Sequence, residues 1–315
     1  MEKYKLDDQE REREKLFAFC GYGHYPSAKI AFMGNEEGLG GYELKYGIKA
    51  RCAAYGNNPE TYLGSTWEDG YYVEGEEIDL RFKEEMKRIR GSLIPESKFY
   101  SPMVEYQARI MLYIENGFKG DWFERCVNNP LAYITIADYY RNIGDYANSG
   151  LYRKQAKVGS ALLDLRPLPR RDESQASSEW PYSNIEENDY NNAFDFRNHR
   201  SMSEESKEFR DRRANYLKKA IQEFSFPIIV GIGAKEVKKL FFEKYLRATF
   251  LPQKTISLTK NKDEVHVSEP LDGTDTVVIL SDYFNSVNGI GLNGLRKLTV
   301  DIIQPIIMEK FPGYC

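Results

Sequence analysis

Short runs of apolar residues, each ending in glycine or in a polar loop, recur along the chain and predict buried strands. Amphipathic segments with apolar residues at helical spacing lie on both sides of the third run, over 203–224 and 234–246. A helix–strand–helix order is typical of a parallel sheet with helices on both faces. The pattern therefore predicts an α/β protein, of three-layer α/β/α type with a central, mainly parallel sheet. The predicted core strands are 28–34, 159–165, 227–233 and 276–280.

The segment between the first two strands predicts helices rather than sheet. Residues 103–157 have a helical pattern throughout, and Gly117 is a possible helix end. We expect residues 85–157 to form a helical insertion. It would divide the α/β domain into an N-terminal part, 1–84, and a C-terminal part, 158–315.

Three further segments carry local signals. The polar, turn-rich stretch 172–184 predicts a long surface loop, and 254–270 predicts a β-hairpin. The last helix is expected over 293–310, with a kink at Pro305 because proline lacks the N–H that an internal helical position needs.

Composition narrows the class of protein. The net charge of −4 and the pI of about 5.7 argue against a basic protein that coats nucleic acid, although they allow a local basic groove. The four cysteines and three histidines have no spacing typical of zinc or iron–sulfur sites, so we expect no metal and no cofactor. No stretch approaches the ~20 apolar residues of a membrane span. We therefore expect a soluble, cytoplasmic protein with no membrane partner.

Polar loops follow three of the predicted strands. The first begins at Gly34, the second at Asp164 and the third at Ser281. In a parallel sheet, loops at the carboxyl ends of strands gather at one edge, which is where α/β proteins usually bind ligands. These loops are therefore the candidate site. Their sequences are Gly-Asn-Glu-Glu-Gly, Asp-Leu-Arg-Pro-Leu-Pro and Ser-Asp-Tyr-Phe-Asn-Ser.

The order of these loops and their strand context resemble the motifs of the uracil-DNA glycosylase superfamily. In that family the first strand ends in glycine and a short loop that activates water. Here Gly34 and Gly38 keep this frame, and Glu37 stands where proline is usual. The resemblance covers about 28–41 and 159–310, and it leaves the helical segment unexplained.

The other two motifs depart from the family at informative positions. Asp164 falls where the family has an asparagine that reads the base edge, and Tyr283 or Asp282 falls at about the place of a histidine. An ionised aspartate only accepts hydrogen bonds, whereas asparagine also donates. Asp164 would therefore suit a base edge rich in N–H donors, and we expect that the substrate is not uracil. The alternative is that Asp164 pairs with a nearby arginine and contacts no ligand.

The resemblance implies roles for the residues of the three loops. Glu36, at the catalytic offset from Gly34, or its neighbour Glu37 would activate water, and Tyr283 would assist the departing base. The alternatives are a solvated acidic loop at these glutamates and a tyrosine that only caps the core. The expected base-binding residues are Tyr42, Asp164 and Asn35. The expected phosphate-binding residues are Arg166, Arg170, Arg171, Ser281, Asn285 and Ser286.

Other basic and aromatic residues are weaker candidates. We expect Lys207, Arg210, Arg212 and Arg213 to lie on the exposed face of one helix, where they are an ordinary solvated surface or contact phosphates. Loop aromatics could stack on a base, among them Tyr55, Trp67, Trp180 and Tyr182.

Two main hypotheses of function follow. The first is a DNA glycosylase-like hydrolase of the N-glycosidic bond of a base, in DNA or in a free nucleotide. The second is a catalytically inactive module of the same fold that binds a nucleotide or nucleic acid. A third, weaker hypothesis is a scaffold in which the helices of 103–157 contact a protein partner.

Overall fold

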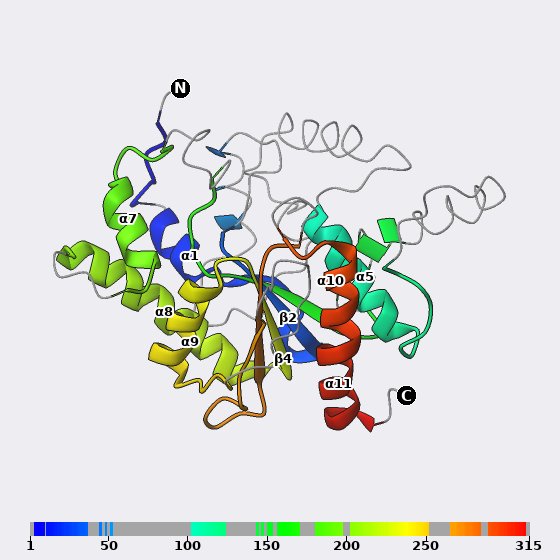
Figure 1. Ribbon diagram of the computed structural model, residues 1–315. Helices are drawn as coiled ribbons and strands as arrows, with labels where there is room; N and C mark the ends of the chain where they lie inside the picture. Colours follow the sequence, from blue (N-terminus) through cyan, green and yellow to red (C-terminus); the bar gives the residue numbers. More distant parts are fainter. Residues whose placement is uncertain are drawn as a thin grey trace.

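The computed structural model describes a sheet flanked by helices, which confirms the predicted α/β class (Figure 1). The described residues are 3–9, 11–36, 44–45, 48, 51–52, 102–123, 143–144, 146–147, 150–153, 156–170, 180–197, 202–251, 265–284 and 289–312. The elements in chain order are α1 (Glu12–Ala18), β1 (Gly21–Gly23), η1 (Tyr25–Ser27), β2 (Ala28–Gly34), α5 (Pro102–Glu115), β3 (Gly159–Asp164), α7 (Glu187–Phe194), α8 (Glu204–Phe224), β4 (Ile228–Ile232), α9 (Lys235–Leu246), β5 (His266–Val267), β6 (Val277–Ser281), α10 (Gly291–Lys297), η4 (Leu298–Ile303) and α11 (Gln304–Lys310).

The sheet has six strands in the order β1-β3-β2-β4-β6-β5. Neighbours among β3, β2, β4 and β6 are parallel, while β1 and β5 add antiparallel edges. The four predicted core strands are all present, and the sheet is mainly parallel as expected. The carboxyl ends of these four strands therefore lie at the same edge.

Alternating side chains of the strands enter two apolar clusters, one on each face of the sheet. In β2, for example, Ala31 and Met33 belong to one cluster, and Ile30 and Phe32 belong to the other. Buried residues of α8 and α9 complete the first cluster, while those of α5, α10 and α11 complete the second (Figure 1). The sheet is thus buried on both faces, as its near-continuous apolar strands require.

The described part of the expected helical insertion packs directly on the sheet. Helix α5 places Ile110, Met111 and Ile114 in the same cluster as β2 and β4. It ends at Glu115, and Gly117 has a φ of 65°, as the expected glycine stop requires. The expectation of helix throughout 103–157 is wrong at 116–123 and 150–153, where turns follow. The domain boundaries at 84 and 157 stay predictions.

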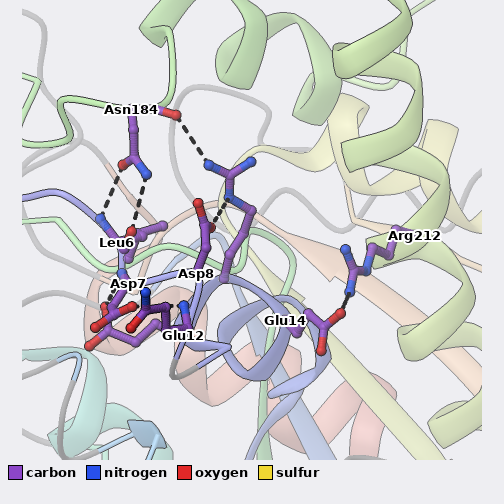
Figure 2. A network of polar contacts seen from close by, with 9 residues as sticks. Leu6, Asp7, Asp8, Glu12, Glu14, Asn184 and Arg212 are labelled. Carbon is purple, nitrogen blue, oxygen red and sulfur yellow. Dashed lines mark hydrogen bonds and ion pairs between the residues drawn. The ribbon is translucent and has the colours of Figure 1, made fainter.

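The charged N-terminal segment forms a helix that the sequence analysis did not expect. Helix α1 is amphipathic, with Leu16 and Phe17 fully buried. Figure 2 shows how polar contacts hold the segment before it: the backbone of Leu6 exchanges two hydrogen bonds with the side chain of Asn184. Glu14 also forms an ion pair of 3.4 Å with Arg212 of α8. The contact between Leu6 and Asn184 joins residues that are 178 positions apart in the chain.

Part of the expected surface loop 172–184 lies in the hydrophobic core instead. Trp180 is 6% exposed and Tyr182 is 1% exposed, so neither aromatic is available to stack on a base. The Trp180 indole donates to the carbonyl of Ile185, and the Tyr182 hydroxyl donates to that of Pro169. Helix α7, which was not expected either, follows this buried segment and adds Tyr190 to the same cluster.

Helix α8 begins where the sequence indicates, but one of its basic residues points inward. Ser203 is the N-cap, and its hydroxyl accepts a hydrogen bond from the Ser206 backbone. Arg213 is fully buried, so the expectation that it lies on the exposed face is wrong. Its guanidinium donates to the carbonyls of Phe17, Phe19, Asp164 and Leu165, and it thereby joins α8 to the end of β3.

The last helix accommodates its proline by a change of helix type. Residues Leu298–Ile303 form a π-helical segment between α10 and α11, and Pro305 lies in the first turn of α11. Proline cannot donate to the carbonyl four residues earlier, and a wider turn before it relieves the resulting clash. The kink expected at Pro305 stays a prediction; the structure shows a π-helical segment directly before this turn.

Candidate functional site

The three candidate loops meet at the carboxyl edge of the sheet, as the sequence predicts. Gly34 and Asp164 are register partners at the ends of β2 and β3. Just beyond them, the backbone N–H of Arg166 donates to the carbonyl of Asn35 over 2.6 Å. At the end of β6, Ser281 accepts from the backbone of Gly233 over 2.9 Å. Side chains that are far apart in the sequence are therefore neighbours at this edge.

Asn35 joins the first loop to the third. Its amide nitrogen donates to the hydroxyl oxygen of Tyr283 over 2.5 Å, and its amide oxygen accepts from the ammonium group of Lys238. Asn35 is 8% exposed and Lys238 is fully buried, whereas Tyr283 is 41% exposed. The network thus runs from the interior, through Asn35, to a tyrosine that faces solvent.

Lys238 is a site residue that the sequence analysis missed. It lies in α9 three residues before Phe241 and four before Phe242, both of which are fully buried. A lysine on the apolar face of an amphipathic helix is the signal that could have revealed it. Its ammonium also donates to the carbonyls of Ile232 and Gly233, over 3.0 and 2.7 Å, at the end of β4.

Two glycines of β4 and its loop make room for this network. A Cβ on Gly233 would lie 2.4 Å from Cε1 of Tyr283, and one on Gly231 would lie 3.0 Å from Cδ of Lys238. Gly233 also has a φ of 69°, which side-chain-bearing residues rarely adopt. The segment Gly-Ile-Gly thus lets a tyrosine and a lysine lie against the backbone.

Glu36 forms ion pairs with two arginines of the second loop. Its carboxylate forms an ion pair with Arg170 and lies 3.7 Å from the guanidinium of Arg166. The Glu36 side chain is 2% exposed, and the Arg170 side chain is 7% exposed. Two guanidinium groups stabilise the charged form of a carboxylate and make it a weak proton acceptor. The geometry therefore favours a structural ion pair over a general base, and it occupies Arg170, which was expected to bind phosphate.

Asp164 lies at the end of β3, where the expected base-reading residue should be. It is 6% exposed, and its carboxylate fits against the backbone of β2 because Gly34 has no side chain; a Cβ there would lie 2.9 Å from Oδ1. Its backbone carbonyl accepts a hydrogen bond from Arg213. Burial, followed by the nearby charge of Asp164, raises the pKa of Tyr152 well above its ordinary value.

The remaining candidate site residues are Ser281, Arg166 and five residues outside the described part of the chain. Ser281 is fully buried as the last residue of β6, so its expected contact with phosphate is wrong for this structure. Arg166 keeps a partly exposed side chain, at 17%. Outside the described residues lie Glu37, Tyr42, Arg171, Asn285 and Ser286.

The described residues offer neither a metal-binding group nor a membrane-spanning helix. These residues contain no group of three or more histidine, cysteine, aspartate or glutamate side chains that could hold a metal ion. Among the same residues, no helix combines the length and the apolar character that crossing a membrane requires.

Comparison with known proteins identifies no family: no family model matches the chain, and neither a curated protein nor a solved structure matches it.

Proposed function

We propose that this chain binds a nucleobase, in a nucleotide or in nucleic acid, at the carboxyl edge of its sheet. The observation that supports the proposal most is the hydrogen bond between Asn35 and Tyr283, beside the strand end that carries Asp164. Ligands of parallel α/β proteins bind at this edge. A base has a ring face and a hydrogen-bonding edge. Tyr283 offers an exposed aromatic side chain for the first, and the carboxylate of Asp164, at the end of β3, is the candidate for the second.

The carboxylate of Asp164 favours particular bases. An ionised carboxylate accepts hydrogen bonds and donates none, so it pairs with ring and amino N–H groups. Guanine presents both groups on one edge, whereas the carbonyl oxygens of uracil would face a negative charge. A guanine-type base therefore fits Asp164 better than uracil does.

Recognition without hydrolysis is the first form of the proposal. The ion pair of Glu36 with Arg170 supports it, because this carboxylate is the residue expected to activate water. The acidic overall charge also favours binding of a single base or nucleotide over extensive contact with a nucleic-acid backbone.

Hydrolysis of the N-glycosidic bond is the second form, and Lys238 favours it. A departing base carries negative charge, and the third loop has no histidine to stabilise it. The buried ammonium of Lys238 lies one hydrogen-bonded residue away from Tyr283 and provides positive charge at that place. In this form Tyr283, held by Asn35, would act on the substrate in place of Glu36.

One pair of assays separates the two forms. Calorimetric titration with guanosine, adenosine, cytidine and uridine measures binding, and a release assay on oligonucleotides with different damaged bases measures hydrolysis. We expect saturable binding that Tyr283→Ala weakens. Base release by the Glu36→Gln variant at the wild-type rate would support Tyr283 over Glu36 as the residue that acts on the substrate. If no nucleoside binds at millimolar concentration and no base is released, the proposed function is wrong.

A further inference from the structure

The buried ammonium of Lys238 donates to oxygen atoms of three residues. The acceptors are the amide oxygen of Asn35 and the backbone carbonyls of Ile232 and Gly233. A lysine in its charged form has three N–H donors and no acceptor. The three acceptors therefore match the charged form and stabilise it in a position where burial would otherwise disfavour it.

Lys238 also determines the orientation of the Asn35 amide. Oxygen and nitrogen of an amide are ordinarily hard to distinguish by position alone. Here the atom facing Lys238 must be the oxygen, because an ammonium cannot accept a hydrogen bond. The nitrogen of Asn35 then faces Tyr283 and donates to the phenolic oxygen over 2.5 Å.

This donation sets the direction of the Tyr283 proton. Because the phenolic oxygen accepts from Asn35, its own O–H bond points away from Asn35, and the tyrosine is 41% exposed. Successive hydrogen bonds with the same direction polarise one another, by about 10–30% per bond in condensed-phase estimates. The chain from Lys238 to Asn35 to Tyr283 thus has the polarity of a proton donor aimed outward.

We propose that Lys238 and Asn35 are positioning residues that make the Tyr283 hydroxyl an outward hydrogen-bond donor for the keto oxygen of a nucleobase. This inference rests on the proposed function and names the chemistry of the ligand. A donor at this place suits the keto oxygen of guanine and not the amino group of adenine, so we expect guanosine to bind more tightly than adenosine. The positive charge behind this hydroxyl comes from α9, through Lys238.

The Asn35→Asp substitution tests the direction of the network with almost no change in shape. A carboxylate still accepts from Lys238, so we expect the protein to fold. However, it can no longer donate to Tyr283, and the phenolic proton turns inward to the carboxylate. We expect guanosine binding to weaken about tenfold to a hundredfold, as expected for one hydrogen bond to a polarised group. Tyr283→Phe should weaken it by a similar factor, and the two changes combined should cost little more than either alone.

Lys235→Met is the matched control for charge. Lys235 lies in the same helix and forms an ion pair of 2.9 Å with Asp282, the neighbour of Tyr283. Removing it changes the local charge as Lys238→Met does but leaves the hydrogen-bonded chain intact. We expect guanosine affinity within about threefold of wild type for Lys235→Met, since surface ion pairs contribute little. An equal loss in Lys235→Met and Lys238→Met would show that only general electrostatics acts, and would overturn the inference.

A spectroscopic measurement separates failure of this inference from failure of the proposed function. Tyrosine labelled with ¹³C at Cζ reports the hydrogen bonding of each phenol, and Tyr283→Phe identifies the resonance. We expect the Tyr283 resonance to shift in Asn35→Asp and Lys238→Met but not in Lys235→Met, with or without guanosine. If the resonance shifts as expected but no nucleoside binds, the ligand assignment and the proposed function are wrong. If guanosine binds and Asn35→Asp neither moves the resonance nor weakens binding, the positioning role is wrong.

Discussion

Replacement of Glu36, which pairs with Arg170, tests whether this glutamate is structural or catalytic, because the two roles predict different changes in the free energy of unfolding. Both side chains are nearly inaccessible, at 2% and 7% exposure, and the guanidinium of Arg166 lies 3.7 Å from the same carboxylate. Glu36→Gln removes the negative charge and leaves two guanidinium groups close together with one of them buried. Breaking one partner of a buried pair costs about 3–5 kcal/mol of the free energy of unfolding.

The loss should be recovered when both partners are replaced. Glu36→Gln and Arg170→Met should each lower the free energy of unfolding by about 3–5 kcal/mol, whereas the double variant should be close to wild type, because replacing a whole buried pair by uncharged groups is often neutral. Urea unfolding followed by circular dichroism measures all four proteins of this cycle. Glu309→Gln, at an exposed position of α11, is the control and should stay within about 0.5 kcal/mol of wild type.

A catalytic glutamate would behave differently in the same cycle. Active-site charges are commonly held at a cost to stability, so their removal is neutral or stabilising. If Glu36→Gln is as stable as wild type and abolishes base release, Glu36 is the general base and its assignment as a structural residue is refuted.

Three further predictions concern the base edge, the glycine loop and alkaline pH. Asp164→Asn restores an N–H donor and should shift nucleoside preference from guanosine toward uridine, which calorimetric competition between the two measures. Gly233→Ala should destabilise the protein by about 1–3 kcal/mol and weaken guanosine binding, since its Cβ would lie 2.4 Å from Tyr283; Gly273→Ala, with a φ of 75° and no atom within 4 Å, should cost only about 1 kcal/mol and leave binding unchanged. Burial raises the pKa of Tyr182 and Tyr152 well above the ordinary value near 10, so they stay neutral in the fold while the unfolded chain ionises. Their stabilising contribution is complete below about pH 10 and falls above it by about 1.4 kcal/mol per pH unit for each tyrosine, which urea unfolding between pH 9 and 11 checks.

The sheet could be predicted from sequence because its strands are nearly continuous apolar runs ending in distinctive loops. The residues 28–34 and 228–232 are buried almost throughout, so a local pattern is enough to identify them. The convergence of the loops then followed from the parallel topology. Helices α1 and α7 were missed because they are short and rich in polar residues, and long-range contacts such as that of Leu6 with Asn184 hold this part of the chain.

The roles of individual charged residues could not be predicted in the same way. Glu36 and Arg170 are 134 positions apart, and their pairing depends on how two loops pack. Arg213 and Lys238 lie in amphipathic helices, where a basic residue usually faces solvent; here backbone carbonyls at strand ends hold both inside. Asn35 was expected to bind the base, and its contact with Lys238, 203 positions away, links the interior to Tyr283.

The location of the binding site is the central claim, and chemical-shift mapping with guanosine tests it most directly. Amide resonances of the ¹⁵N-labelled protein are recorded during a titration with guanosine to millimolar concentration. We predict that the largest saturable changes occur at Asn35, Asp164, Arg166, Gly233 and Tyr283, around the carboxyl ends of β2, β3, β4 and β6. Saturable changes that cluster elsewhere, for example on the outer surface of α8, or no change at any concentration, would contradict the account.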